Sequence, residues 1–187
     1  MKKWILPVAV MAILAIICCV KSCAHNQAFR SFFNKRISLC GDAEIDAVIG
    51  DFLVAAQNED AAAMRKLFAP AAVTEIGEAA LDGMISDFIR YYEGETASVE
   101  VLFGSAVDET SVDGKESQMI RAPIDVSTIQ RQYRLAVKYV PRDDWHGENE
   151  GIWSVYIIGR EKDTDLAQPY RGDLQYRSGI FFDVARP

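Results

Sequence analysis

The hydrophobic pattern of the chain changes its period near Thr96, and this change most constrains the fold. Before it, apolar residues recur every three to four positions, as in helices that bury one side. After it, apolar and polar residues alternate, which is typical of half-buried strands. Helices that precede a run of strands, instead of alternating with them, predict an α+β domain with the helices on one face of a curved antiparallel sheet.

Capping residues and a proline set the bounds of three expected helices. Asp42 and Asp60 are good N-cap residues, and Gly94 is well placed to end a helix. Pro70 closes the second helix, because proline disfavours helical backbone in the residue before it. The expected helices are 42–58, 60–70 and 78–92.

Five strands are expected after the helices, at 97–103, 119–126, 129–139, 152–160 and 178–185. Residues 108–117 form a polar turn region, in which Asp113-Gly114 is a hairpin signal. Pro123 predicts an edge strand or a bulge. The third strand has the clearest half-buried alternation, and the fourth is apolar on both sides, which favours a central position.

The N-terminus predicts export from the cytoplasm. Lys2 and Lys3 precede an apolar run of 17 residues, Trp4 to Val20. A helix of this length spans about 25 Å, slightly less than the ~30 Å hydrocarbon core of a bilayer. Val20-Lys21-Ser22-Cys23 resembles a bacterial lipobox, with Cys23 as the lipid attachment site, although Lys21 occupies a slot that is normally small or apolar.

Three interpretations of this segment stay open: a cleaved lipoprotein signal, an uncleaved membrane anchor and the signal of a secreted protein. All three place the following residues outside the cytoplasm. The expected organisation is a signal or anchor at 1–23, a tether at 24–41 and an α+β domain at 42–187.

Charge and cysteine content narrow the classes of partner. Three of the 20 basic residues precede residue 24 and none of the 27 acidic ones does, so residues 24–187 carry 17 bases against 27 acids. Such an acidic domain repels phosphate backbones, and we expect no nucleic-acid partner. Cys18 and Cys19 lie in the apolar run; with Cys23 acylated, Cys40 would have no disulfide partner within the chain.

The order of helices and strands resembles the nuclear transport factor 2-like cone, also called the cystatin-like superfamily. More narrowly, the chain is similar to a family of exported lipoproteins of uncharacterised function from Gram-positive bacteria. The segments that carry the likeness are 46–70, 88–101, 133–158 and 179–182. The resemblance implies the cone fold, and it supplies no catalytic residues.

Candidate site residues lie on the expected strands. The resemblance also implies an enzyme alternative, because enzymes with the cone fold use a pocket carboxylate as a base, aided by a tyrosine or a second acid. Here Asp183, with Tyr133, Tyr139 and Tyr156, could line the concave face of the sheet. His146 stands alone among acids in the polar loop 141–151, so neither a metal site nor a cofactor is expected.

The leading hypothesis is therefore a non-catalytic, membrane-tethered domain outside the cytoplasm. Its concave sheet would bind a small ligand, a peptide or a second copy of the chain. The alternatives are an isomerase- or dehydratase-like enzyme that uses Asp183 and a structural envelope protein. The expected partners are the membrane, through the N-terminal lipid or helix, and a homodimer formed through the sheet.

Overall fold

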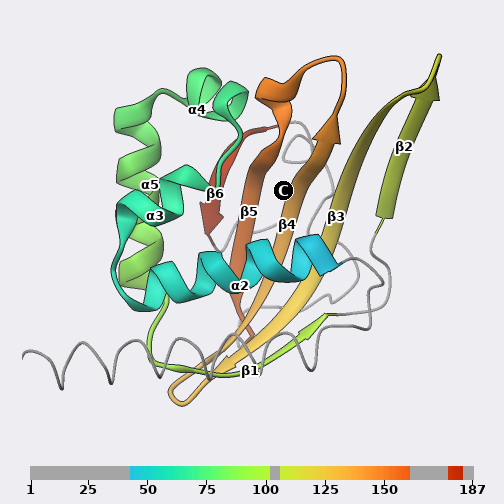
Figure 1. Ribbon diagram of the computed structural model, residues 1–187. Helices are drawn as coiled ribbons and strands as arrows, with labels where there is room; N and C mark the ends of the chain where they lie inside the picture. The colour runs from blue at the N-terminus through green and yellow to red at the C-terminus, as the bar shows by residue number, and fades with distance from the viewer. Residues whose placement is uncertain (1–42, 102–105, 161–176, 183–187) are drawn as a thin grey trace, which may run out of the picture.

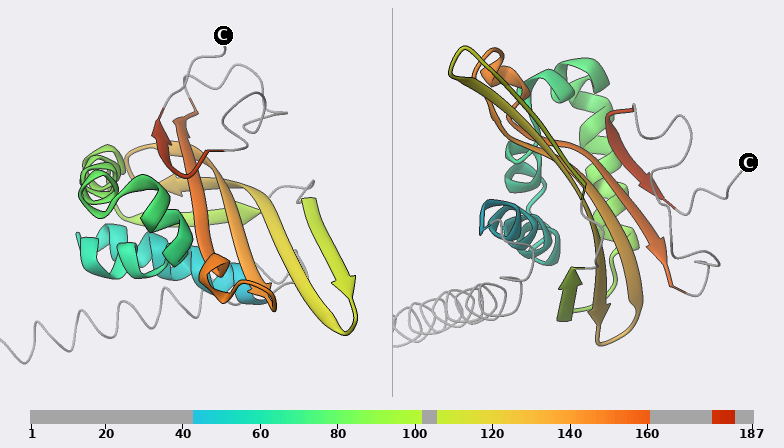
Figure 2. Two further views of the ribbon diagram at one scale, coloured as in Figure 1. Left: turned by 90° about the horizontal axis from the view of Figure 1, so that it is seen from above. Right: turned by 90° about the vertical axis from the view of Figure 1, so that its right-hand side faces the viewer.

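The computed structural model describes residues 43–101, 106–160 and 177–182. It shows an α+β domain in which N-terminal helices pack on one face of a mostly antiparallel six-stranded sheet (Figures 1 and 2). The helices are α2 (Ala43–Gln57), α3 (Ala61–Lys66), α4 (Pro70–Ile76) and α5 (Glu78–Tyr91). The strands are β1 (Thr96–Val101), β2 (Ala106–Val112), β3 (Lys115–Thr128), β4 (Gln132–Asp143), β5 (Gly151–Gly159) and β6 (Gly179–Phe182), with a short 3-10 helix, η1 (Gly147–Asn149).

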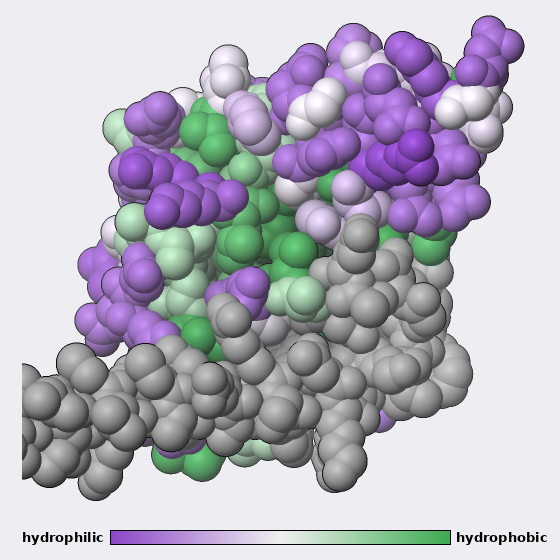
Figure 3. All heavy atoms as spheres, in the orientation of Figure 1, coloured by the Kyte–Doolittle hydropathy of each residue, from purple (hydrophilic) through white to green (hydrophobic). Residues whose placement is uncertain are grey.

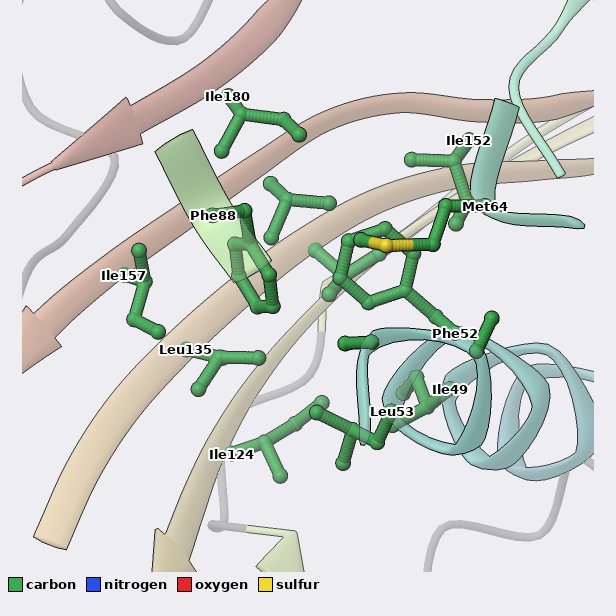
Figure 4. Close-up of a cluster of buried hydrophobic side chains, with 14 of the residues drawn as sticks. Ile49, Phe52, Leu53, Met64, Phe88, Ile124, Leu135, Ile152, Ile157 and Ile180 are labelled. Atoms are coloured by element: carbon green, nitrogen blue, oxygen red, sulfur yellow. The ribbon is translucent and has the colours of Figure 1, made fainter. Parts of the chain in front are cut away.

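The strands are ordered β1-β3-β4-β5-β6, and β2 pairs with β3 beside β1. The helix-facing side of β3, β4 and β5, here called the inner face, packs against α2, α3 and α5 to form the core. The labelled residues in Figure 4 are ten members of this cluster. Phe52 of α2 meets Phe88 of α5 edge to face, with ring centroids 5.0 Å apart. Each buried side chain of this size contributes about 1.5–3 kcal/mol of transfer free energy.

The α+β class is confirmed, but the expected set of three helices is wrong. The first and third expected helices match α2 and α5, and the Asp60 carboxylate accepts a hydrogen bond from Ala63 N at 2.9 Å as an N-cap of α3. Pro70 does not close α3, which ends at Lys66, but is the first residue of α4. Proline favours this position, since the backbone N–H that it lacks would have no helical partner there.

The expected polar turn 108–117 is mostly strand. Only Asp113 and Gly114 turn the chain, with φ angles of 52° and 78°. Strand β2 before this turn pairs with β3 after it, starting at Val112 and Lys115. Every β2 side chain whose burial the structure describes is exposed. A strand with no buried face shows no hydrophobic alternation, and the sequence pattern therefore concealed it.

Pro123 lies in an interior strand, contrary to the expected edge or bulge. Strand β3 pairs with β4 on one side and with β1 and β2 on the other. Residues 124–128 pair with β1 and residues 115–121 with β2, so Pro123 lies at the break between the two partners. Its missing N–H is tolerated there because no strand residue is registered opposite it on that side.

Two further corrections concern β4 and β6. Strand β4 is not half-buried, because Arg134 and Ala136 on its other face are buried as well. Strand β6 is parallel to β5, whereas an antiparallel strand was expected. The connection 160–178 exceeds the dozen residues that a crossover to a parallel strand needs.

Gly151 allows the chain after α3 to cross the start of β5. Ala69 N donates to Ile152 O at 2.9 Å, and Ile152 N donates to Leu67 O at 2.8 Å. Gly151 has a φ of 130°, and a Cβ on it would lie 2.6 Å from Ala69 N. A side chain at this position would therefore separate the helical layer from the sheet.

We expect Gly151→Ala to lower the free energy of unfolding by at least about 2 kcal/mol, because it combines a steric clash with an unfavourable φ. The matched control is Gly83→Ala in α5, where the added Cβ meets nothing within 4 Å and φ is helical. That change should raise the free energy of unfolding by about 0.5–1 kcal/mol. Chemical denaturation of both variants measures the difference, and equal stabilities would contradict the close approach described above.

Candidate functional site on the outer face of the sheet

The three candidate tyrosines do not share one face of the sheet. Tyr133 and Tyr139 point to the inner face, where Tyr133 is fully buried and Tyr139 packs against the core. Tyr156 is registered beside Ala136 and points to the opposite face, here called the outer face. Asp183 and Cys23 lie outside the described residues. Tyr156 therefore lies on the face of the sheet opposite Tyr133 and Tyr139.

Tyr133 holds the end of α5 against the sheet. Its hydroxyl donates to Tyr91 O at 3.0 Å and accepts from Glu93 N at 2.8 Å. Burial raises the pKa of Tyr133, although the hydrogen bond from Glu93 and the nearby Arg131 oppose this. The hydroxyl of Tyr91 in turn accepts from Gly159 N at 3.0 Å. Both hydroxyls therefore serve structural hydrogen bonds.

The outer face carries a buried ion pair between β3 and β4. Asp125 and Arg134 are direct cross-strand neighbours. Arg134 Nε lies 2.8 Å from Asp125 Oδ1, and Arg134 Nη2 lies 3.0 Å from Asp125 Oδ2. The Arg134 side chain is only 4% exposed. Such a bidentate pair fixes strand register as well as charge, and the loss of one partner would leave a buried charge without compensation.

Further along the same face, two cations lie side by side. Arg121 of β3 is the direct cross-strand neighbour of Lys138 of β4. Arg121 Nη2 pairs with Asp108 of β2, but its Nε is buried and has no hydrogen-bond partner among the described residues. Burial, and next the charge of Arg121, lower the pKa of Lys138, and the carboxylate of Glu75 opposes this. Like charges in direct register repel, and Asp108 compensates the charge of Arg121 only.

A β-bulge brings an aromatic side chain to the same place. Lys138 is registered with Ser154 and Tyr139 with Ile152, so Trp153 is an extra residue in β5. Bulges re-aim side chains, and here the indole lies under Lys138, with Nζ 5.3 Å from the ring centroid. Trp153 Nε1 donates to Asn149 O at 2.8 Å, which fixes the ring. Arg121, Lys138 and Trp153 together are called the cation site below.

The sequence analysis missed the cation site, although a signal was available. Arg121 and Lys138 occupy alternate positions on strands whose other positions are apolar, within a domain that is strongly acidic. To predict that Arg121 and Lys138 are neighbours, one must know the β3–β4 register, and to place Trp153 beside them one must know the bulge in β5. Among residues 43–101, 106–160 and 177–182, no group of three His, Cys, Asp or Glu side chains could hold a metal ion.

A second feature is a groove of about 380 Å³ on the hairpin formed by β2 and β3. Its walls include Glu109 of β2, Glu116 and Gln118 of β3, and Arg142 of β4. Arg142 donates to Glu116 at 2.5 Å and to both carboxylate oxygens of Asp144, at 2.8 and 2.7 Å. The groove is therefore polar, with more carboxylates than cations.

We expect Tyr133→Phe to lower the free energy of unfolding by about 1–2 kcal/mol, because Glu93 N–H and Tyr91 C=O lose their shared partner. Urea denaturation measures this effect. An unchanged stability would contradict the structural role assigned to this hydroxyl.

Comparison with known families assigns the chain to a family. Residues 51–160 match the family model described as a domain of unknown function, DUF5104. The match runs from α2 to the residue after β5, and it includes the β2–β3 hairpin and the cation site. No match was found among the curated proteins. Because the family model covers more than half of its length, the chain belongs to the DUF5104 family.

Proposed function

We propose that the chain is a non-catalytic binding domain, held at the membrane outside the cytoplasm, that takes an anionic group of its ligand at Arg121 and Lys138. The anionic group is a carboxylate or a phosphate. One observation carries the proposal: two half-buried cations are direct neighbours on the outer face, and among the described residues only Asp108 forms an ion pair with either of them.

The energetics of this pair favour an added anion. A half-buried charge loses hydration, and a like charge beside it adds repulsion. An anionic oxygen beside the two side chains would be attracted by the guanidinium group of Arg121 and the ammonium group of Lys138 together. Hydrogen bonds between ionised groups are about twice as strong as neutral ones. The fixed indole of Trp153 offers an apolar surface for the part of the ligand that carries the anion.

The inner face is less suited to binding. Its aromatic side chains are packed against the helices, and the hydroxyls of Tyr91 and Tyr133 are engaged in hydrogen bonds within the fold. The enzyme alternative depends on Asp183, which lies outside the described residues. We therefore place the proposed ligand site on the outer face.

The order of helices and strands supports a further assignment to the nuclear transport factor 2-like cone, since helices cover one face of the sheet and long antiparallel strands form the other layer. The lipobox-like residues before Cys23 support attachment to the membrane through a lipid on that cysteine. No helix within the described parts of the chain is long and apolar enough to cross a membrane.

The first test measures anion binding to the full-length chain in a mild detergent. Phosphate, phosphoserine, acetate and succinate are compared by isothermal calorimetry, so that phosphate and carboxylate ligands are separated. Lys138→Met keeps the aliphatic stem and removes the charge, and it should weaken the preferred anion about tenfold or more. Arg121→Met should act in the same direction.

The matched control is Lys66→Met, the same change on an exposed lysine of α3 on the helical side. It should leave the affinity unchanged. If none of the four anions binds, or if Lys66→Met weakens binding as much as Lys138→Met, the cation site is not a ligand site.

The second test concerns the membrane. With Cys23 lipidated, Cys23→Ala should abolish the lipid and the cleavage that precedes it, because the acylated thiol directs both. Mass spectrometry of the N-terminus of the exported protein measures this. A wild-type chain that retains Met1 and an unmodified Cys23 would contradict lipid attachment.

A further inference from the structure

Strand β2 forms the outer arm of a projecting hairpin. The hairpin of β2 and β3 extends beyond the helical layer (Figure 2), and among the described residues β2 is paired with β3 alone. Its second edge therefore presents backbone N–H and C=O groups along seven residues, Ala106–Val112. Unpaired groups of this kind are a template for another extended chain.

This edge lacks the features that usually prevent strand addition. The sequence Ala-Val-Asp-Glu-Thr-Ser-Val contains no lysine and no proline. Its pairing with β3 runs in register from Ala106 to Val112 without a bulge. Val107 and Val112 are also 48% and 54% exposed, so apolar side chains are available near both ends of the strand. Natural edges that must stay unpaired are normally shortened, bulged or charged with lysine.

The charges on the hairpin select the occupant. Residues 106–118 contain four acids and one base, Lys115. Two of the acids pair with arginines of the sheet, Asp108 with Arg121 and Glu116 with Arg142. Glu109 accepts a hydrogen bond from the neutral amide of Gln118 at 2.7 Å, and no cation of the described residues forms an ion pair with it. In Figure 3, hydrophilic surface covers this end of the sheet. An extended segment with basic side chains fits this edge.

A second copy of the chain fits poorly. Two β2 strands paired antiparallel about their middle residue would bring Glu109 opposite Glu109 of the second copy. Like charges directly opposite each other destabilise a strand pair, and Asp108 beside each Glu109 adds to the repulsion. The charge on the edge therefore favours a different protein as the partner.

We propose that β2 binds an extended, basic segment of another protein by strand addition. The segment carries two adjacent basic residues opposite Asp108 and Glu109, and apolar residues opposite Val107 and Val112. Backbone hydrogen bonds supply affinity, and the side-chain pattern supplies specificity. The proposal does not require an anion at the cation site, although the two sites share Asp108, which pairs with Arg121; within the described residues Glu109 has no such link to the cation site and is the residue that the test changes.

The probe is the peptide acetyl-Val-Thr-Thr-Lys-Lys-Val-Thr-amide, which presents this pattern when antiparallel to β2. Binding to the full-length chain in detergent is followed by hydrogen exchange, and the expected result is protection of amides in 106–112. Glu109→Lys should weaken the peptide about fivefold or more. Glu100→Lys is the matched control, because it makes the same charge change at an exposed position of β1 and should leave the affinity unchanged.

A second peptide with alternate backbone amides N-methylated separates strand addition from charge attraction. It keeps both lysines but cannot pair along its length, and it should bind at least about tenfold more weakly. Equal binding of the two peptides would overturn the proposal, and so would the absence of binding by the unmodified peptide. Protection of 106–112 that rises with protein concentration alone would overturn it in favour of a second copy.

Discussion

The packing of apolar side chains between the helices and the inner face of the sheet is the interaction on which the rest of the structure depends. Phe52, Leu53 and Phe88 pack α2 and α5 onto β3, β4 and β5. The helices therefore cover the core residues of the inner face. The hydroxyl of Tyr133 then secures the end of α5 to the sheet instead of facing a ligand.

Because the inner face is closed by packing, the outer face carries the charged groups. The bidentate pair of Asp125 and Arg134 compensates two charges and joins β3 to β4. Arg121 and Lys138 follow the same two strands, but only Arg121 forms an ion pair with a carboxylate among the described residues. The first pair is typical of a structural ion pair, whereas the second is the pair of cations on which the proposed anion site rests.

Local signals predicted local features well. Asp60 predicted a helix start, Asp113-Gly114 predicted a turn, and the periodicity predicted α2 and α5. The features that the sequence did not predict depend on which strand lies beside which. Strand β2 is polar on both faces, and β6 is parallel only because a long connection returns the chain to the same edge.

The candidate site shows the same division. Tyrosines on predicted strands could be listed from the sequence, but the face of the sheet to which each points depends on register and bulges. Tyr133 and Tyr156 therefore fell on opposite faces. The neighbourhood of Arg121, Lys138 and Trp153 exists only through the β3–β4 register and one extra residue in β5. No pattern within a single segment of the sequence predicts that these three side chains lie together.

The most direct measurement is the titration of the Lys138 ammonium group by NMR in the full-length chain, with and without phosphate or acetate. Burial and the neighbouring guanidinium of Arg121 should hold its pKa below that of an ordinary lysine. An anion bound between the two side chains should raise that pKa, because it stabilises the charged form. A Lys138 that titrates like an exposed lysine and does not respond to either anion would contradict the proposed role of the outer face.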